Sequence, residues 1–71
     1  MGGRIMNFHE HSAWINEIYL ENPLTTFYYT GQKWNSEPVT ITHITPYWGE
    51  YLSEKGERFA GELFNLRKQW N

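Results

Sequence analysis

Three histidines are the residues of this 71-residue chain with the side chains best suited to bind a metal ion: His9, His11 and His43. On a helix, His9 and His11 would point about 200° apart and could not share an ion, although in an extended segment they would face the same side. A three-histidine site would also require the N-terminal segment to fold onto the segment that contains His43. We therefore expect no metal centre and no cofactor.

Residues for nucleophilic or acid–base catalysis are sparse. The chain has no cysteine and no aspartate, and its three serines show no spacing that suggests a catalytic triad. Four glutamates could supply a carboxylate pair, but their spacing is typical of a solvent-exposed helix face; they are Glu50, Glu54, Glu57 and Glu62. A chain of this length also has little room for a pocket that excludes water. We predict that the protein is not an enzyme.

Aromatic residues are the most unusual part of the composition, with four Trp, five Tyr and four Phe. Tyr and Trp are enriched at the centres of protein interfaces, and this chain has more of them than a small core requires. We predict a small non-catalytic interaction or regulatory module that forms a homo-oligomer, most simply a dimer, and binds a protein partner through an aromatic surface. The predicted interface consists of Tyr28, Tyr29, Trp34, Tyr47, Trp48 and Tyr51.

Nucleic-acid binding is the alternative hypothesis. Its candidate contacts are Lys33, Trp34, Arg67 and Lys68. Six basic residues against eight acidic ones cannot cover many phosphates, so exposed rings would have to stack on single-stranded bases. The acidic balance favours a protein partner over a nucleic acid.

The first structural element is expected to be a helix over residues 8–21. Asn7 and Glu10 have the spacing of a capping box, and apolar side chains recur on one helical face from Phe8 to Ile18. Pro23 ends the helix. This helix would carry two of the three histidines.

The middle of the chain predicts an antiparallel β-hairpin, because residues 25–30 and 39–44 are rich in β-branched and aromatic side chains. A turn at residues 35–36 would place Tyr28 opposite His43, with a bulge at Gly31. A turn at residues 31–32 with a longer connection is the other possible layout. A short third strand over residues 50–52 follows the turn at Pro46.

The last part of the chain predicts an amphipathic helix that begins near Glu57, with Ser53 as a candidate N-cap. Its apolar face is formed at i, i+4, i+7 and i+11 by Phe59, Leu63, Leu66 and Trp70. Gly61 inside this helix would cost up to about 1 kcal/mol relative to Ala, and would allow another backbone to approach closely.

Residues 51–59, Tyr-Leu-Ser-Glu-Lys-Gly-Glu-Arg-Phe, resemble the junction in winged-helix transcription regulators at which the last wing strand leads into a C-terminal helix. The resemblance implies a DNA-binding regulator whose C-terminal helix forms a dimer. The chain departs from that family upstream, where residues 24–45 have the pattern of strands in place of a helix-turn-helix.

Together these patterns predict a single α+β domain over residues 1–71, with an N-terminal helix, an antiparallel hairpin and a C-terminal helix packed on the sheet. No apolar run is long enough to span a membrane, and the start of the chain lacks the pattern of a signal peptide. We expect a cytoplasmic protein.

Overall fold

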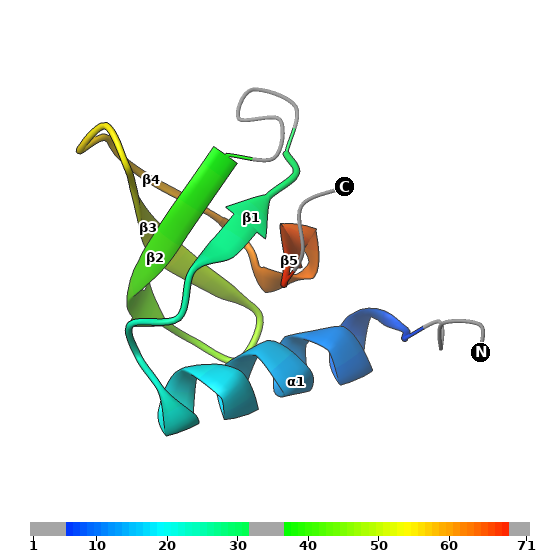
Figure 1. Ribbon diagram of the computed structural model, residues 1–71. Helices are drawn as coiled ribbons and strands as arrows, with labels where there is room; N and C mark the ends of the chain where they lie inside the picture. Colours follow the sequence, from blue (N-terminus) through cyan, green and yellow to red (C-terminus); the bar gives the residue numbers. More distant parts are fainter. Residues whose placement is uncertain (1–5, 32–36, 69–71) are drawn as a thin grey trace.

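A computed structural model describes residues 6–31 and 37–68. The helix α1 (Phe8–Glu21) is followed by one antiparallel sheet, whose strands are β1 (Phe27–Tyr29), β2 (Glu37–Ile44), β3 (Trp48–Ser53), β4 (Arg58–Glu62) and β5 (Leu66–Arg67). A 3-10 helix, η1 (Leu63–Asn65), connects β4 to β5. Figure 1 shows α1 lying across one side of the sheet.

The sheet is strongly curled. Its strand order is β4-β3-β2-β1-β5, so β4 and β5 lie at opposite ends of the order although only the three residues of η1 separate them in the chain. The sheet must bend round to bring these two edges within reach of each other. A bulge between Ile41 and His43 of β2 contributes to this bend, because an extra residue in one strand increases its local twist.

The N-terminal helix confirms the prediction. The side chain of Asn7 accepts a hydrogen bond from the backbone N–H of Glu10, at 2.8 Å, and the Glu10 carboxylate accepts one from the N–H of Asn7, at 3.3 Å. At the other end the N–H of Asn22 still bonds to the carbonyl of Ile18, and Pro23 follows. Both ends of the helix are set by residues that are close together in the sequence, and their positions can therefore be predicted from the sequence.

The register expected from a turn at residues 35–36 is wrong. β1 and β2 do pair in antiparallel fashion, but Tyr28 lies opposite Pro38 and not His43. Gly31 follows the end of β1, so the expected bulge is not inside this strand, and residues 32–36 lie outside the described part of the chain. The observed register places Phe27 and Tyr29 on the buried face, which is the arrangement that the core selects.

The predicted C-terminal helix is also wrong, and with it the fold class as we expected it. Residues 58–62 form β4, which pairs along its length with β3, and the segment after it is η1 and β5. Ser53 does not cap a helix: its hydroxyl oxygen accepts hydrogen bonds from the N–H groups of Lys55 and Glu57, both at 3.2 Å, within a tight hairpin turn. Gly56 completes this turn with φ +86°.

This turn also differs from what the resemblance to winged-helix regulators implied. A type I turn followed by a glycine in the left-handed region is a standard connection of a three-residue hairpin loop. The N–H of Gly56 bonds to the carbonyl of Ser53, and the N–H of Ser53 to the carbonyl of Glu57. The turn therefore joins two strands, and the C-terminal helix that the resemblance implied is absent from residues 37–68.

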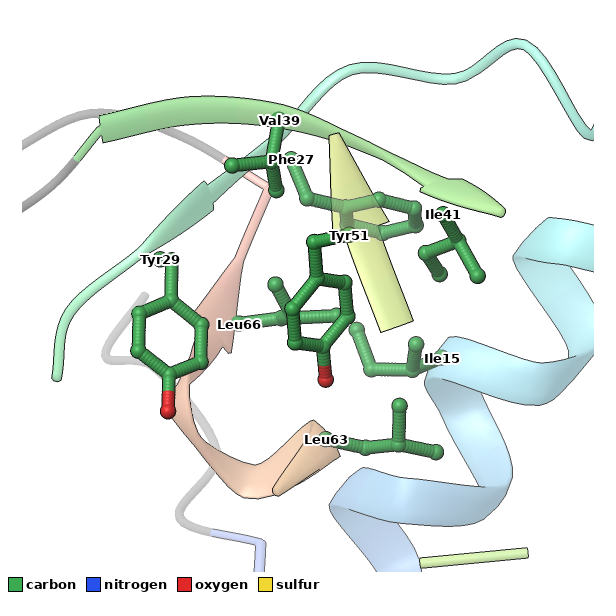
Figure 2. Close-up of a cluster of buried hydrophobic side chains, with 8 residues drawn as sticks. All are labelled: Ile15, Phe27, Tyr29, Val39, Ile41, Tyr51, Leu63 and Leu66. Atoms are coloured by element: carbon green, nitrogen blue, oxygen red, sulfur yellow. The ribbon is translucent and has the colours of Figure 1, made fainter. Parts of the chain in front are cut away.

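The core lies inside the curl of the sheet and is closed by α1. Its eight buried hydrophobic residues are Ile15, Phe27, Tyr29, Val39, Ile41, Tyr51, Leu63 and Leu66. In Figure 2, Ile15 of α1 points into the group formed by Tyr51 and the two leucines. Leu63 and Leu66 are therefore buried as the apolar periodicity suggested, but in η1 and β5 and not on a helix. Within the described residues, no helix has the length and apolar character needed to cross a membrane.

Candidate functional site

An open groove runs between α1 and the connection from β2 to β3. It has a volume of about 370 Å³ and is lined by His9, Ala13, Asn16, Glu17, Pro46 and Tyr47. We call it the α1 groove. The four helical residues lie on the side of α1 that faces away from Ile15, and the other two come from the connection.

Tyr47 is held in one position at the end of this groove. Its ring stacks on Phe8, with ring centres 5.3 Å apart and planes inclined by 17°. Its hydroxyl lies 3.0 Å from Nδ1 of His9, which is hydrogen-bonding distance. The side chain nevertheless remains 44% exposed. Tyr47 thus presents an ordered, partly open aromatic surface, fixed by two residues from the first turn of the helix.

The connection that carries Tyr47 is itself tied down. The hydroxyl of Thr45 donates to the carbonyl of Trp48, at 2.8 Å, and accepts from the N–H of Trp48, at 3.1 Å. Asn16 links this connection to the helix, because its amide nitrogen lies 3.3 Å from the carbonyl oxygen of Thr45 and 3.4 Å from that of Pro46. The two walls of the α1 groove are therefore joined by hydrogen bonds, which keeps the groove preformed.

A row of rings continues from the groove along α1. Phe8 also contacts Phe64 of η1, and Phe64 contacts His11, which in turn contacts Trp14; the ring centres are 5.5 to 5.7 Å apart. Ring pairs at these distances add stability beyond that of area burial. Through Phe8 and Phe64, the row of rings connects the groove with η1.

His11 is a buried structural member of this row. Its Nε2 lies 2.7 Å from the carbonyl oxygen of Leu66, and because that oxygen can only accept, Nε2 must carry a proton. Burial lowers the pKa of His11 below its ordinary value of 6.5, and the nearby charge of Arg67 lowers it further, against the opposing effect of the hydrogen bond. His11 is therefore neutral at physiological pH.

The groove side of α1 is acidic and apolar. The helix contains Glu10, Glu17 and Glu21 but no Lys or Arg. Leu20, one turn beyond Asn16, is 78% exposed, and Leu24 just after the helix is 81% exposed. Large apolar side chains this exposed, on and just after a helix that also carries acidic residues, mark a candidate contact surface.

The aromatic residues of the predicted interface are divided by the fold. Tyr47 and Trp48 are exposed and Tyr28 is half-buried, whereas Tyr29 and Tyr51 lie in the core; Trp34 lies outside the described residues. A buried ring cannot reach a partner while the domain stays folded. Of the predicted residues that the structure describes, Tyr28, Tyr47 and Trp48 are thus accessible to one.

The predicted nucleic-acid contacts are not gathered in one described place. The Arg67 guanidinium donates hydrogen bonds to the carbonyls of Phe64 and Leu66, at 2.6 and 3.0 Å, and lies over the Phe64 ring. Arg67 therefore closes the turn between η1 and β5. Lys68 is exposed next to it, and Lys33 and Trp34 lie outside the described residues.

The histidines do not converge. His9 contacts Tyr47, His11 contacts Leu66, and His43 lies exposed on β2 beside the ring of Trp48. Among residues 6–31 and 37–68, no group of three or more His, Asp or Glu side chains could hold a metal ion.

Sequence reasoning missed two residues of this surface: Asn16, which lines the groove, and Leu20, which is exposed one turn further along α1. One signal for Leu20 was available, because at 3.6 residues per turn it lies about 140° from Ile15 and so outside the apolar face of the helix. An apolar residue on the polar side of an amphipathic helix indicates a contact surface or a local packing role. The contribution of Asn16 had no such signal, since its partners lie 29 and 30 residues further along the chain.

Comparisons with protein families, with characterised proteins and with solved structures find no match to this chain.

Proposed function

We propose that the chain is a small, non-catalytic cytoplasmic interaction module that self-associates and binds a segment of a protein partner in the α1 groove. The observation that carries the proposal is the state of Tyr47, which is 44% exposed yet fixed by a stacked ring and a hydrogen bond. Exposed tyrosines in defined positions are typical centres of binding energy in protein interfaces.

The fixed geometry of the groove supports binding with little loss of conformational entropy. Asn16 already joins the helix to the β2–β3 connection, and Phe8 already sets the orientation of Tyr47. Ordering a mobile side chain at an interface costs about 0.5–1.5 kcal/mol, and the contacts of Tyr47 with Phe8 and His9 should reduce that cost. A partner would therefore meet a surface that requires no rearrangement.

The charge of α1 indicates the chemistry of the partner. Glu17 lines the groove, Glu10 and Glu21 lie on the same helix, and Leu20 extends the apolar surface by one turn. The complementary segment has apolar side chains for Tyr47 and Leu20, with Lys or Arg beside them for the carboxylates. The partner we propose is thus a short basic and apolar peptide segment.

The same geometry favours binding over catalysis. His9 and Tyr47 form a hydrogen-bonded pair, but the groove is open, whereas acid–base catalysis generally uses groups in a site that excludes water.

A displayed library of random peptides, selected on the full chain, tests this proposal. We expect the selected peptides to combine Lys or Arg with large apolar residues and to bind more weakly as the salt concentration rises. Tyr47→Ala should weaken the best peptide about tenfold or more, since it removes the fixed ring. Glu17→Lys should weaken basic peptides specifically.

Trp48→Ala is the matched control, because Trp48 is 43% exposed, next to Tyr47 in the chain, and not part of the groove lining. It should leave peptide binding unchanged. Selection of no binding peptide, or loss of binding with Trp48→Ala but not with Tyr47→Ala, would overturn the proposal.

A further inference from the structure

The outer edge of β4 is open within the described part of the chain. β4 is the first strand in the sheet order and pairs only with β3. One backbone hydrogen bond lies at each end of this pairing. At one end the N–H of Ser53 donates to the carbonyl of Glu57, and at the other the N–H of Leu63 donates to the carbonyl of Tyr47. Because hydrogen-bonded pairs recur every second residue in an antiparallel ladder, Phe59 and Gly61 direct their backbone groups toward β3. The other three residues of β4 are Arg58, Ala60 and Glu62. Their backbone N–H and C=O groups therefore point away from the sheet.

The sequence of this edge is complementary to itself. β4 reads Arg-Phe-Ala-Gly-Glu, with Arg58 and Glu62 at equal distances from the central Ala60. If two copies of β4 lie antiparallel about Ala60, each Arg58 faces the Glu62 of the other copy. Each Phe59 likewise lies opposite a Gly61, which has no side chain that could clash with it.

Both charges are available for such a pairing. The side chains of Arg58, Ala60 and Glu62 are exposed, and within the described residues neither Arg58 nor Glu62 forms an ion pair. Ala60 is small enough for close approach at the centre. Open strand edges associate readily unless a protein blocks them, and the described β4 contains neither a proline nor a bulge.

We propose that two copies of this chain form a symmetric dimer by antiparallel pairing of their β4 edges, centred on Ala60. This inference rests on the self-association part of the proposed function and names the surface that would perform it. Backbone hydrogen bonds at Ala60 and between Arg58 and Glu62 of opposite copies join the two sheets into one. The two Arg58–Glu62 pairs set the register, because a shift of two residues along the strand breaks both pairs.

The dimer is expected to be weak. Five residues per copy bury less than the roughly 800 Å² per partner of a standard interface. We therefore expect dissociation constants between about 1 µM and about 1 mM. Sedimentation velocity across this range of concentration should show a monomer–dimer equilibrium.

Charge reversal tests the register. In Arg58→Glu, both cross-strand pairs become Glu opposite Glu, and in Glu62→Arg both become Arg opposite Arg. Each single variant should dimerise about tenfold more weakly than the parent chain. An equimolar mixture of the two single variants should recover association, because every pair is then of opposite sign. The double variant R58E/E62R should dimerise alone, with the charges exchanged.

Ala60→Pro tests the backbone pairing. Proline removes an N–H that points away from β3, so an edge strand tolerates it, but the central hydrogen bonds of the dimer are lost. We expect a folded monomer by circular dichroism and no dimer by sedimentation. Glu21→Arg is the control, since Glu21 is exposed at the end of α1 and lies outside the sheet.

Two results would overturn the proposal: a monomer at all concentrations up to about 1 mM, or a dimer that neither single charge reversal weakens. Neither result bears on the α1 groove, whose peptide binding is measured separately with Tyr47→Ala. Failure of the dimer and failure of the proposed peptide binding are therefore distinguishable.

Discussion

The ring of Tyr29 in β1 lies directly against the backbone of Gly61 in β4. A Cβ atom added to Gly61 would overlap the Tyr29 hydroxyl oxygen and would lie 2.7 Å from its Cζ atom. The tyrosine also contacts the rings of Phe59 and Tyr51, with centres 5.0 and 5.4 Å away, and its hydroxyl accepts a hydrogen bond from Asn65. This contact joins two strands that are not neighbours in the sheet, and so it holds the curl closed.

Substitution of Gly61 by alanine should therefore destabilise the protein by about 1–3 kcal/mol, the usual cost of overpacking a core. In a helix the same change would stabilise by up to about 1 kcal/mol, so the sign of the effect separates strand from helix at this position. Urea unfolding measures it. The loss should be smaller in a Tyr29→Leu background, and an equal loss in both backgrounds would contradict the proposed overlap.

Tyr51 should make stability fall at alkaline pH. Burial raises the pKa of Tyr51 well above its ordinary value of 10.0. Above pH 10 the unfolded chain releases the phenolic proton while the folded chain retains it, so stability decreases as the pH rises from there. Tyr51→Phe should remove this dependence.

The same substitution has an expected cost at neutral pH. Tyr51 donates a 2.7 Å hydrogen bond to the carbonyl of Gly61, and its loss should cost about 0.5–1.5 kcal/mol. Tyr28→Phe, at a half-buried tyrosine, serves as the control and should retain the alkaline loss. Persistence of that loss in Tyr51→Phe would show that another group causes it.

His11 should make stability fall on the acid side. Its lowered pKa means that, below pH 6.5, the unfolded chain binds a proton that the folded chain does not, so stability decreases as the pH drops. His11→Gln keeps an N–H donor for the Leu66 carbonyl and does not titrate. Urea midpoints at pH 7.5 and 5.0 should differ less for this variant than for the parent chain. His9→Gln should leave the difference unchanged.

Gly56 tests the hairpin turn. Its φ of +86° lies in the left-handed region, and within the described residues no heavy atom beyond Gly56 and its two chain neighbours lies within 4 Å of the place a Cβ would occupy. Gly56→Ala should therefore cost about 1–2 kcal/mol through backbone strain alone. Gly56→Asn should cost less, because asparagine tolerates this conformation better. Equal stability of the parent and both variants, measured by urea unfolding, would show that the turn adopts another conformation.

The N-terminal helix shows what neighbouring residues can determine. Asn7 and Glu10 form the capping box that their spacing predicts, and the helix ends before Pro23 as expected. Each of these features involves residues three or four positions apart, so their energies do not depend on the rest of the fold. The sequence alone was sufficient to locate this element.

The C-terminal segment shows where local patterns fail. Phe59, Leu63 and Leu66 recur at helical spacing, and the core does bury both leucines, but Phe59 belongs to a strand and the leucines to η1 and β5. The alternation of exposed and half-buried residues along β4 also fits a strand, and pairing with β3 decided between the two. That pairing depends on a turn at Gly56. The helical interpretation treated the residues of this turn as the start of a helix.

The aromatic residues were recognised from composition, but their division between core and surface was decided by tertiary structure. Tyr29 and Tyr51 are buried because the curl of the sheet brings β1, β3 and β4 together, whereas Tyr47 is exposed because its turn packs on the outer side of α1. Strand register sets which ring faces inward, and a shift of one residue reverses it. The sequence by itself determined the helix and the supply of rings. Contacts between distant residues determined the sheet, its register and the groove, because their energies appear only when the chain has folded.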